Sequence, residues 1–145
     1  MFILPRQDPV LEFPSFAMID SFLVPANTVA TAKGDGPAVE VSGAANRVFL
    51  LALRITRIVE QEALDVSVYG SADGNAWEGK PLIAFPQKFY AGEHPLLLDL
   101  TAQPEIRFLR ARWEVNRWGR GPETPMFEFD LAVKEVPKEV LQQAG

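Results

Sequence analysis

Apolar and polar residues alternate along much of the chain, a pattern typical of β-strands that bury one face. In the segment 64–69, LDVSVY, a leucine and two valines alternate with aspartate, serine and tyrosine. The segments 105–115 and 126–136 alternate in the same way and place Trp113 and Phe129 on inward faces. We therefore predict strands in all three segments, with Trp113 in the core.

Pairing of the last two of these strands would set arginines against acids. The first carries Arg110 and Arg112 on its outward face, and the second carries Glu128 and Asp130. If the two strands are neighbours, these side chains form cross-strand ion pairs worth about 0.2–1 kcal/mol each. Such pairs would help to set the register more than they would stabilise the fold.

The segment 46–60, NRVFLLALRITRIVE, begins with apolar residues on two faces. Phe49 and Leu51 fall on one face, while Val48, Leu50 and Ala52 fall on the other. Its length alone would also suit a helix, but its flanks are strand-like and a capping box is absent. We predict a strand that is covered on both faces at its beginning.

Turn signals containing glycine separate the runs, at 34–36, 73–74 and 91–92. The Asp-Gly pair at 73–74 suits a hairpin turn of type I′, which requires positive φ angles. About eight short strands and almost no helix predict an all-β fold, a single β-sandwich with jelly-roll or Greek-key connections over residues 28–136. The short tail 137–145 has the length for one helical turn.

The first 27 residues differ from the rest of the chain. Prolines at positions 5, 9, 14 and 25 separate short apolar groups. Proline removes a ladder donor and keeps the preceding residue extended, so we predict an extended arm with at most short edge strands. The arm is too apolar for a solvated tail, and it packs either on its own domain or on a neighbouring subunit. Its expected assembly residues are Phe2, Ile3, Leu4, Leu11, Phe13 and Phe16.

Composition and charge reduce the number of partner classes that we expect. The 145 residues, of which 48% are apolar, suit one domain with one core. A net charge of −5 disfavours nucleic acid, and ion pairs would explain the five arginines that accompany one acid between residues 107 and 120. No apolar run approaches the ~20 residues of a membrane helix, and no secretory signal is seen. We expect a cytoplasmic or virion/particle-associated protein.

Two stretches resemble a known kind of sandwich. LDVSVYGSADGNAW (64–77) joins an alternating strand, a serine, Asp-Gly and a tryptophan, and IRFLRARWEV (106–115) with MFEFDLAV (126–133) resembles its partner strands. The pattern is similar to discoidin-like, galactose-binding-type jelly rolls and to small β-sandwich proteins encoded among the virion genes of tailed phages. The resemblance covers roughly residues 36–133. It implies a jelly roll, with ligands bound by loops at one end in the discoidin-like group.

Groups suited to catalysis or metal binding are few. His94 is the single histidine and cysteine is absent, which leaves few routes to a nucleophile–base pair or a transition-metal site. We therefore expect no enzyme, no cofactor and no metal. The oxygens of Asp73 to Asn75 would suit calcium, but a spaced series of ligands is missing, so a turn is the simpler interpretation.

The stretch WEVNRWGRGPETP, residues 113–125, is the candidate contact loop. A loop tryptophan such as Trp118 stacks on a sugar or anchors a protein interface. Alternatively, it covers the open end of the sandwich and takes a cation–π contact from an arginine. The sequence leaves both alternatives open. The expected contact residues are Trp118, Arg117, Arg120, Asn116 and Tyr90.

The sequence supports two main functions. The first is a non-catalytic structural or assembly protein that self-associates, or docks on a larger virion-like particle, through its arm and its sandwich edges. Open edges offer unpaired backbone groups to a second copy or to a larger protein assembly. The alternative is a carbohydrate-binding module that holds a glycan with the Trp118 loop. A third hypothesis is a cytoplasmic adaptor without assembly of its own.

Overall fold

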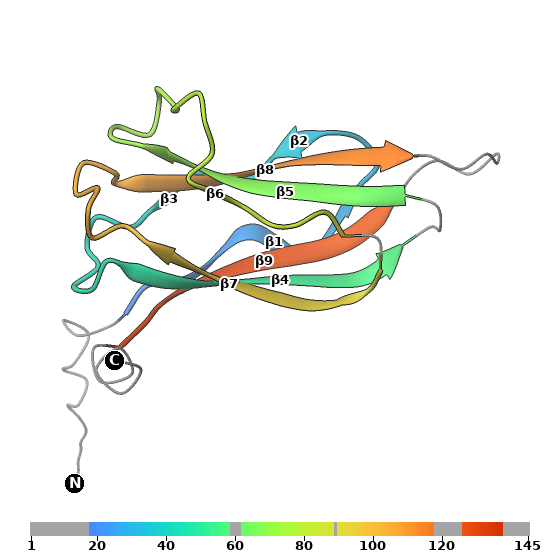
Figure 1. Cartoon of the computed structure of the whole chain (residues 1–145), viewed down its shortest axis with the longest axis horizontal. Coiled ribbons are helices and arrows are strands. Elements are labelled where there is room, and N and C mark those ends of the chain that lie inside the picture. Colours follow the sequence, from blue (N-terminus) through green and yellow to red (C-terminus); the bar gives the residue numbers. More distant parts are fainter. Residues whose placement is uncertain (1–17, 59–61, 89, 118–125, 138–145) are drawn as a thin grey trace, which may run out of the picture.

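The alternating segments form antiparallel strands, and the computed structural model describes residues 18–58, 62–88, 90–117 and 126–137. Two antiparallel sheets pack face to face as a sandwich (Figure 1). The four-stranded sheet runs in the order β1 (Asp20–Ala30), β9 (Phe127–Glu135), β4 (Val48–Ile58) and β7 (Gly92–Asp99). The five-stranded sheet consists of β2 (Gly34–Asp35), β8 (Phe108–Arg117), β5 (Glu62–Ser71) and β6 (Ile83–Ala84) in that order, with β3 (Val39–Glu40) also paired to β8.

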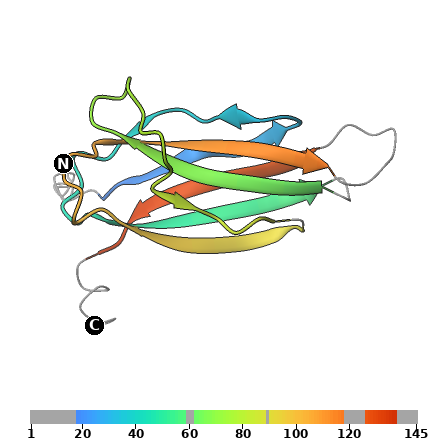
Figure 2. The same ribbon diagram turned by 45° about the horizontal axis from the view of Figure 1, so that its top comes forward.

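The prediction of an all-β sandwich is confirmed. The described residues form nine strands and no helix, where the sequence predicted about eight strands. From β4 onward the long strands alternate between the sheets: β4, β7 and β9 lie in one, and β5 and β8 lie in the other (Figure 2). Each connection therefore carries the chain across the sandwich, so that the inward side chains of both sheets meet in one core.

The core consists of the inward residues of the long strands. Leu51 and Leu53 of β4 and Phe129 of β9 are fully buried from one sheet, and Val68 of β5 is fully buried from the other. Trp113 of β8 is 9% exposed, and its ring meets the ring of Phe129 edge-on at 5.4 Å between centroids. The prediction that Trp113 is a core residue is confirmed.

The strand predicted in the segment 46–60 is present as β4, but its second face is only partly covered. Val48 is 8% exposed, so burial on both faces holds at the first residue. Two residues later Leu50 is 36% exposed, and Ala52 is half-buried. The prediction of two covered faces is therefore wrong beyond Val48 within the described part of the chain.

The strand β1 includes residues 20–27, the last part of the predicted arm. It forms an edge of the four-stranded sheet and contains Pro25, which suits an edge position because proline offers no N–H donor. Two register shifts interrupt its pairing with β9, and Asn27 has a positive φ of 64°. The arm's expected assembly residues, Phe2 to Phe16, lie outside the described residues.

The last two long strands are not neighbours, so the condition for cross-strand pairs between Arg110 or Arg112 and the acids of β9 is not met. β8 pairs with β5, β2 and β3 in one sheet, whereas β9 pairs with β4 and β1 in the other. Asp130 consequently bonds to Arg54 and Glu128 to Arg57, rather than to arginines of β8. An alternating pattern determines which side chains face the core, but it holds no information about which strand is the neighbour.

Two valines on neighbouring strands test the assignment of the core. Val133→Ala removes methyl groups from a fully buried site on β9, and we expect the free energy of unfolding to fall by about 2 kcal/mol. Val29→Ala makes the same change at a side chain that is 55% exposed on β1, and we expect a change within about 0.5 kcal/mol. Urea denaturation measures both. Equal losses would contradict the inward assignment of Val133.

Candidate functional site

The outer face of the four-stranded sheet carries a continuous set of apolar side chains. The register sets Phe22 of β1 beside Ala132 of β9, Ala132 beside Ala52 of β4, and Ala52 beside Pro95 of β7. In the adjacent row Leu50 pairs with Leu97 of β7. We call this set of residues the apolar face: Phe22, Leu50, Ala52, Pro95, Leu97 and Ala132.

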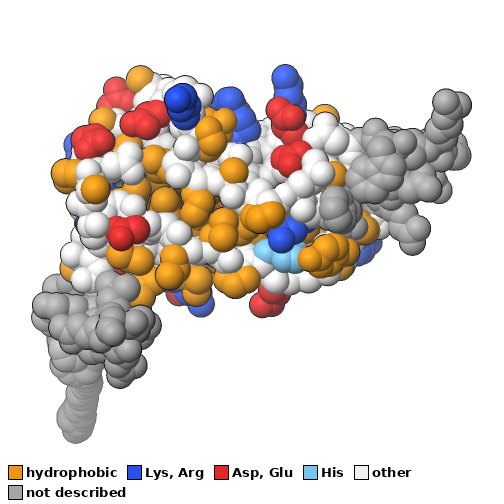
Figure 3. Space-filling view, in the orientation of Figure 1, with side chains coloured by type: hydrophobic (Ala, Val, Ile, Leu, Met, Phe, Trp, Pro, Cys, Tyr) orange, Lys and Arg blue, Asp and Glu red, His pale blue; other side chains and the backbone are white. Residues whose placement is uncertain are grey.

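The large side chains of the apolar face are open to solvent. Phe22 is 43% exposed and Leu97 is 59% exposed. Hydrophobic side chains also gather over the neighbouring side of the molecule, where the edge strands β6 and β7 lie (Figure 3). Single exposed apolar residues are ordinary, whereas large contiguous apolar patches mark interaction sites, so the apolar face is the candidate surface.

An ion pair bounds the apolar face in the middle of the sheet. Arg54 of β4 donates from Nε and Nη2 to Oδ2 of Asp130 on β9, at 3.2 and 2.8 Å. Asp130 points outward, yet it is only 4% exposed because the arginine covers it. The hydrogen bond to Asp130 and the charge of that carboxylate raise the pKa of Arg54. Glu93 of β7 lies opposite Arg54 and completes a charged row.

The apolar row that contains Phe22 and the charged row that contains Arg54 line a shallow groove of about 380 Å³ on the outer face of the four-stranded sheet. Apolar side chains form its centre and charged side chains form its borders. Asp20 and Lys134, which face each other in the register of β1 and β9, lie at one border. The groove is lined by Asp20, Phe22, Ala52, Arg54, Glu93, Asp130, Ala132 and Lys134.

The outer face of the five-stranded sheet differs in that two of its arginines, Arg110 and Arg112, lie against aromatic rings. Arg110 lies 4.4 Å from the ring centroid of Trp77, and Arg112 lies 5.2 Å from that of Tyr69. Arg112 Nε also donates to Asp35 Oδ1 at 2.8 Å, and this bond raises the pKa of Arg112. The prediction that cross-strand ion pairs explain the arginine-rich region is therefore confirmed for Arg112.

The predicted contact loop falls mostly outside the described residues. Trp118 and Arg120 lie there, and the side chain of Arg117 is not described either. Asn116 Nδ2 donates to Asp65 Oδ2 at 2.7 Å. Tyr90 is 54% exposed, and its ring meets that of His94 edge-on at 5.5 Å. The two described members of the predicted contact site, Asn116 and Tyr90, therefore contact different strands, β5 and β7 respectively.

The predicted turn at residues 73–74 is a wider loop between β5 and β6. Only Gly74 has a positive φ, of 82°, so the type I′ geometry predicted for this pair is wrong. Instead, Asp73 Oδ1 accepts hydrogen bonds from the backbone N–H groups of Asn75 and Ala76, at 2.8 and 2.9 Å. The carboxylate that would have served calcium thus organises its own loop. The described residues contain no cluster of His, Asp and Glu suited to a metal ion.

Comparisons with known proteins add no family to this description. A scan against models of protein families finds no match, and a search of curated proteins finds none. Among the described residues no helix has the length and apolar character to cross a membrane. The functional argument therefore rests on the geometry of the apolar face.

Sequence reasoning did not identify the apolar face as a site, although the signal was present. The alternation of β4 places Leu50 and Ala52 on its second face, where a half-buried strand would carry polar residues. An apolar second face was interpreted as internal burial. The sequence cannot distinguish burial within one chain from burial against a partner.

Asp73 gives the protein a stability that depends on pH. Backbone hydrogen bonds from Ala76 and then Asn75, with a further bond from the Ser71 hydroxyl, lower the pKa of Asp73. A lowered pKa in the folded state contributes stability above the unfolded value of about 3.9. That contribution is lost as pH falls through the lower folded value.

We therefore expect Asp73→Asn to reduce the loss of stability in acid. The asparagine keeps an oxygen acceptor but carries no charge, so its bonds do not depend on proton uptake. Urea denaturation of both proteins at pH 7 and at about pH 3 measures the effect, and the free energy of unfolding should fall further in the wild type. Parallel losses in the two proteins would contradict this role of Asp73.

Proposed function

We propose that the protein is a non-catalytic structural protein that self-associates, or docks on a larger virion-like particle, through its N-terminal arm and its sandwich. The observation that carries this proposal is the exposed apolar face. Burial of apolar surface is the dominant favourable term in protein association. The partly exposed Phe22, Leu50 and Leu97 offer such surface on one rigid sheet.

The edges of the sandwich give less support to assembly than the outer face does. β7 contains Pro95, and β1 contains Pro25 together with two register shifts. The other sheet ends in strands of two residues, β6 on one side and β2 and β3 on the other. Short edge strands, prolines and bulges all hinder the addition of a neighbouring strand. We therefore assign assembly to the face rather than to backbone pairing at an edge.

The connections of the strands support the finer fold assignment. Alternation of β4, β5, β7, β8 and β9 between the sheets is typical of a jelly roll. This arrangement favours the proposed relation to discoidin-like sandwiches and to β-sandwich proteins of tailed-phage virions. Within that relation, a particle-associated role agrees with an exposed apolar face.

The alternative, a carbohydrate-binding module, has one observation in its favour. Tyr90 exposes 54% of its surface, and a partly exposed tyrosine ring offers a platform for a sugar. The aromatic rings of the five-stranded sheet support this alternative less well. Guanidinium groups lie over the rings of Tyr69 and Trp77, on the outer face that a sugar would approach.

Light scattering coupled to size-exclusion chromatography, across a wide range of protein concentration, tests the proposed function. We expect the full chain to form a species larger than its 16.1 kDa monomer. Deletion of residues 1–17 should shift this species toward the monomer and leave the melting temperature of the sandwich unchanged. The deletion must end at residue 17, because β1 begins at Asp20 and a longer deletion would remove an edge strand.

Tyr90→Ala serves as the control that separates the two functions. Under the assembly hypothesis this variant keeps the mass of the full chain. Under the carbohydrate hypothesis it loses retention on immobilised glycans, while the full chain remains a monomer. A 16.1 kDa species at every concentration would overturn the assembly hypothesis.

A further inference from the structure

We propose that the groove on the apolar face receives residues 1–17 of a second copy of the chain. This inference rests on the proposed function and names the surface and the segment through which the copies associate. It follows from the pattern of β4, from the chemistry of the arm and from the place where the described chain begins.

The central strand β4 is built for contact on two sides. Its inward residues Leu51 and Leu53 are fully buried by the opposite sheet. Its outward residues Leu50 and Ala52 lie between β9 and β7, in the middle of the sheet and away from its edges. Polar residues would occupy this position in a sheet that faces water. The second side of β4 therefore calls for an apolar cover that the described residues do not supply.

The sequence of residues 1–17 suits this cover. Three phenylalanines, two leucines and an isoleucine stand in short groups that are separated by Pro5, Pro9 and Pro14. Proline prevents the segment from joining a sheet as a central strand, but it does not hinder side-chain contact with a face. Proline-spaced segments bind aromatic-lined grooves through preformed extended backbone, and the groove carries Phe22.

The length of the segment is sufficient. Seventeen extended residues span about 56 Å at 3.3 Å per residue. The four strands of the sheet span about 14 Å between their outer members, at about 4.8 Å per strand spacing. The segment can therefore leave one copy, reach the next and still cross the whole face.

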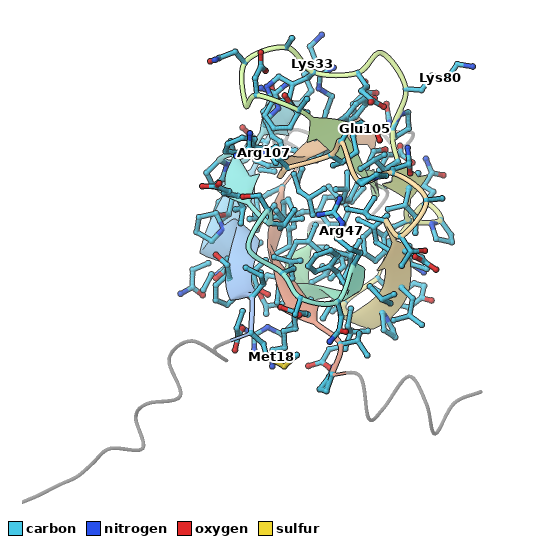
Figure 4. All side chains as sticks on the ribbon, turned by 90° about the vertical axis from the view of Figure 1, so that its left-hand side faces the viewer. Met18, Lys33, Arg47, Lys80, Glu105 and Arg107 are labelled. Atoms are coloured by element: carbon cyan, nitrogen blue, oxygen red, sulfur yellow. The ribbon has the colours of Figure 1, made fainter. Side chains whose placement is uncertain are left out.

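The direction of the chain at its first described residues favours a second copy over the same copy. Ile19 N donates to Glu135 Oε1 at 3.1 Å, and Glu135 N donates to Ile19 O at 2.8 Å. These bonds hold Ile19 in line with β1. Met18 lies at the end of the sandwich beside the four-stranded sheet, where the chain enters and leaves (Figure 4). The groove begins at Asp20 and Phe22, so a return to it would require reversal directly before Met18.

The residues that precede this point disfavour turns that need a positive φ angle, while their prolines, Asp8 and Ser15 suit turns with negative φ angles. Glycine and asparagine, which supply positive φ angles in tight turns, are absent from residues 1–17. An outgoing segment that continues past the sheet meets a neighbour without such a turn. Exchange of arms between two copies would close the assembly with two-fold symmetry.

The borders of the groove match those of a protein interface. An apolar centre with a polar rim is the ordinary anatomy of such contacts. Here the centre is Phe22, Ala52 and Ala132, and the rim consists of Asp20 and Lys134 on one side and Arg54, Asp130 and Glu93 on the other. Arg54 and Asp130 already form an ion pair, so docking of the arm over them does not bury an isolated charge.

Cysteine cross-linking tests the inference, because the chain has no cysteine of its own. One full-length variant carries Ser15→Cys in the arm, and another carries Leu97→Cys on the apolar face. Mixed and treated with a short bismaleimide, they should give a covalent dimer containing one of each. Replacement of the second variant by Val29→Cys, which is 55% exposed on the same sheet but outside the apolar face, should abolish that dimer.

A double variant with Ser15→Cys and Leu97→Cys distinguishes the two routes of the arm. We expect covalent oligomers from it at low concentration. An internally cross-linked monomer would overturn the inference, because it would show that the arm covers its own sheet. A full chain that is oligomeric but gives no cross-link between arm and face would also overturn it, while the proposed function would stand. A full chain that is monomeric would overturn both.

A charge placed on the apolar face, beside the groove, provides an independent measurement. Leu50→Lys should weaken self-association about tenfold or more, because it buries an unpaired ammonium group beneath the arm. Val29→Lys is the matched control, and its dissociation constant should stay within about twofold of the wild type. Circular dichroism verifies that both variants fold. Equal dissociation constants for the two variants would contradict docking at Leu50.

Discussion

A strand presents successive side chains to opposite faces, and this period of two constrains the whole protein. Register is therefore decisive, since a slip of one residue would exchange the buried and the exposed set. The ion pair of Arg54 and Asp130 joins the two central strands, β4 and β9, at positions that face each other in the register. In this register the inward face of β9 carries Phe129 and Leu131, and its outward face carries Ala132.

The period of two also explains how far the fold could be predicted. It identified most of the long strands, the sandwich and the burial of Trp113, because each depends on which way a side chain points, whereas β1 lies largely in the segment predicted as the arm. Strand neighbours depend on connections across the sandwich, so the pattern left open whether Arg110 would meet Asp130, and in the structure their strands lie in different sheets. The turn at Asp73 failed for a local reason, since its carboxylate bonds to the backbone N–H groups of Asn75 and Ala76.

The candidate site could be predicted only in part, because an apolar residue can belong either to the core or to an exposed face. The sequence drew attention to an aromatic loop around Trp118, because aromatic residues and arginines in a loop are conspicuous. The apolar face consists of residues that are also ordinary core residues, such as Leu50 and Ala52. Their significance depends on the three-dimensional arrangement, which leaves Leu50 at the centre of an outer face. Pattern alone assigned them to the interior.

Open edges and an open face have different consequences for assembly. Backbone pairing at an edge repeats with each added copy, because every new strand leaves a new edge exposed. A sheet face that binds the side chains of a partner is covered by that partner, so each face is used only once. Pro25, Pro95 and the two-residue edge strands hinder the first route in this sandwich, while Leu50 and Leu97 leave the second open. The number of copies would then be set by how many faces and arms can meet, which limits association to a closed or ordered assembly.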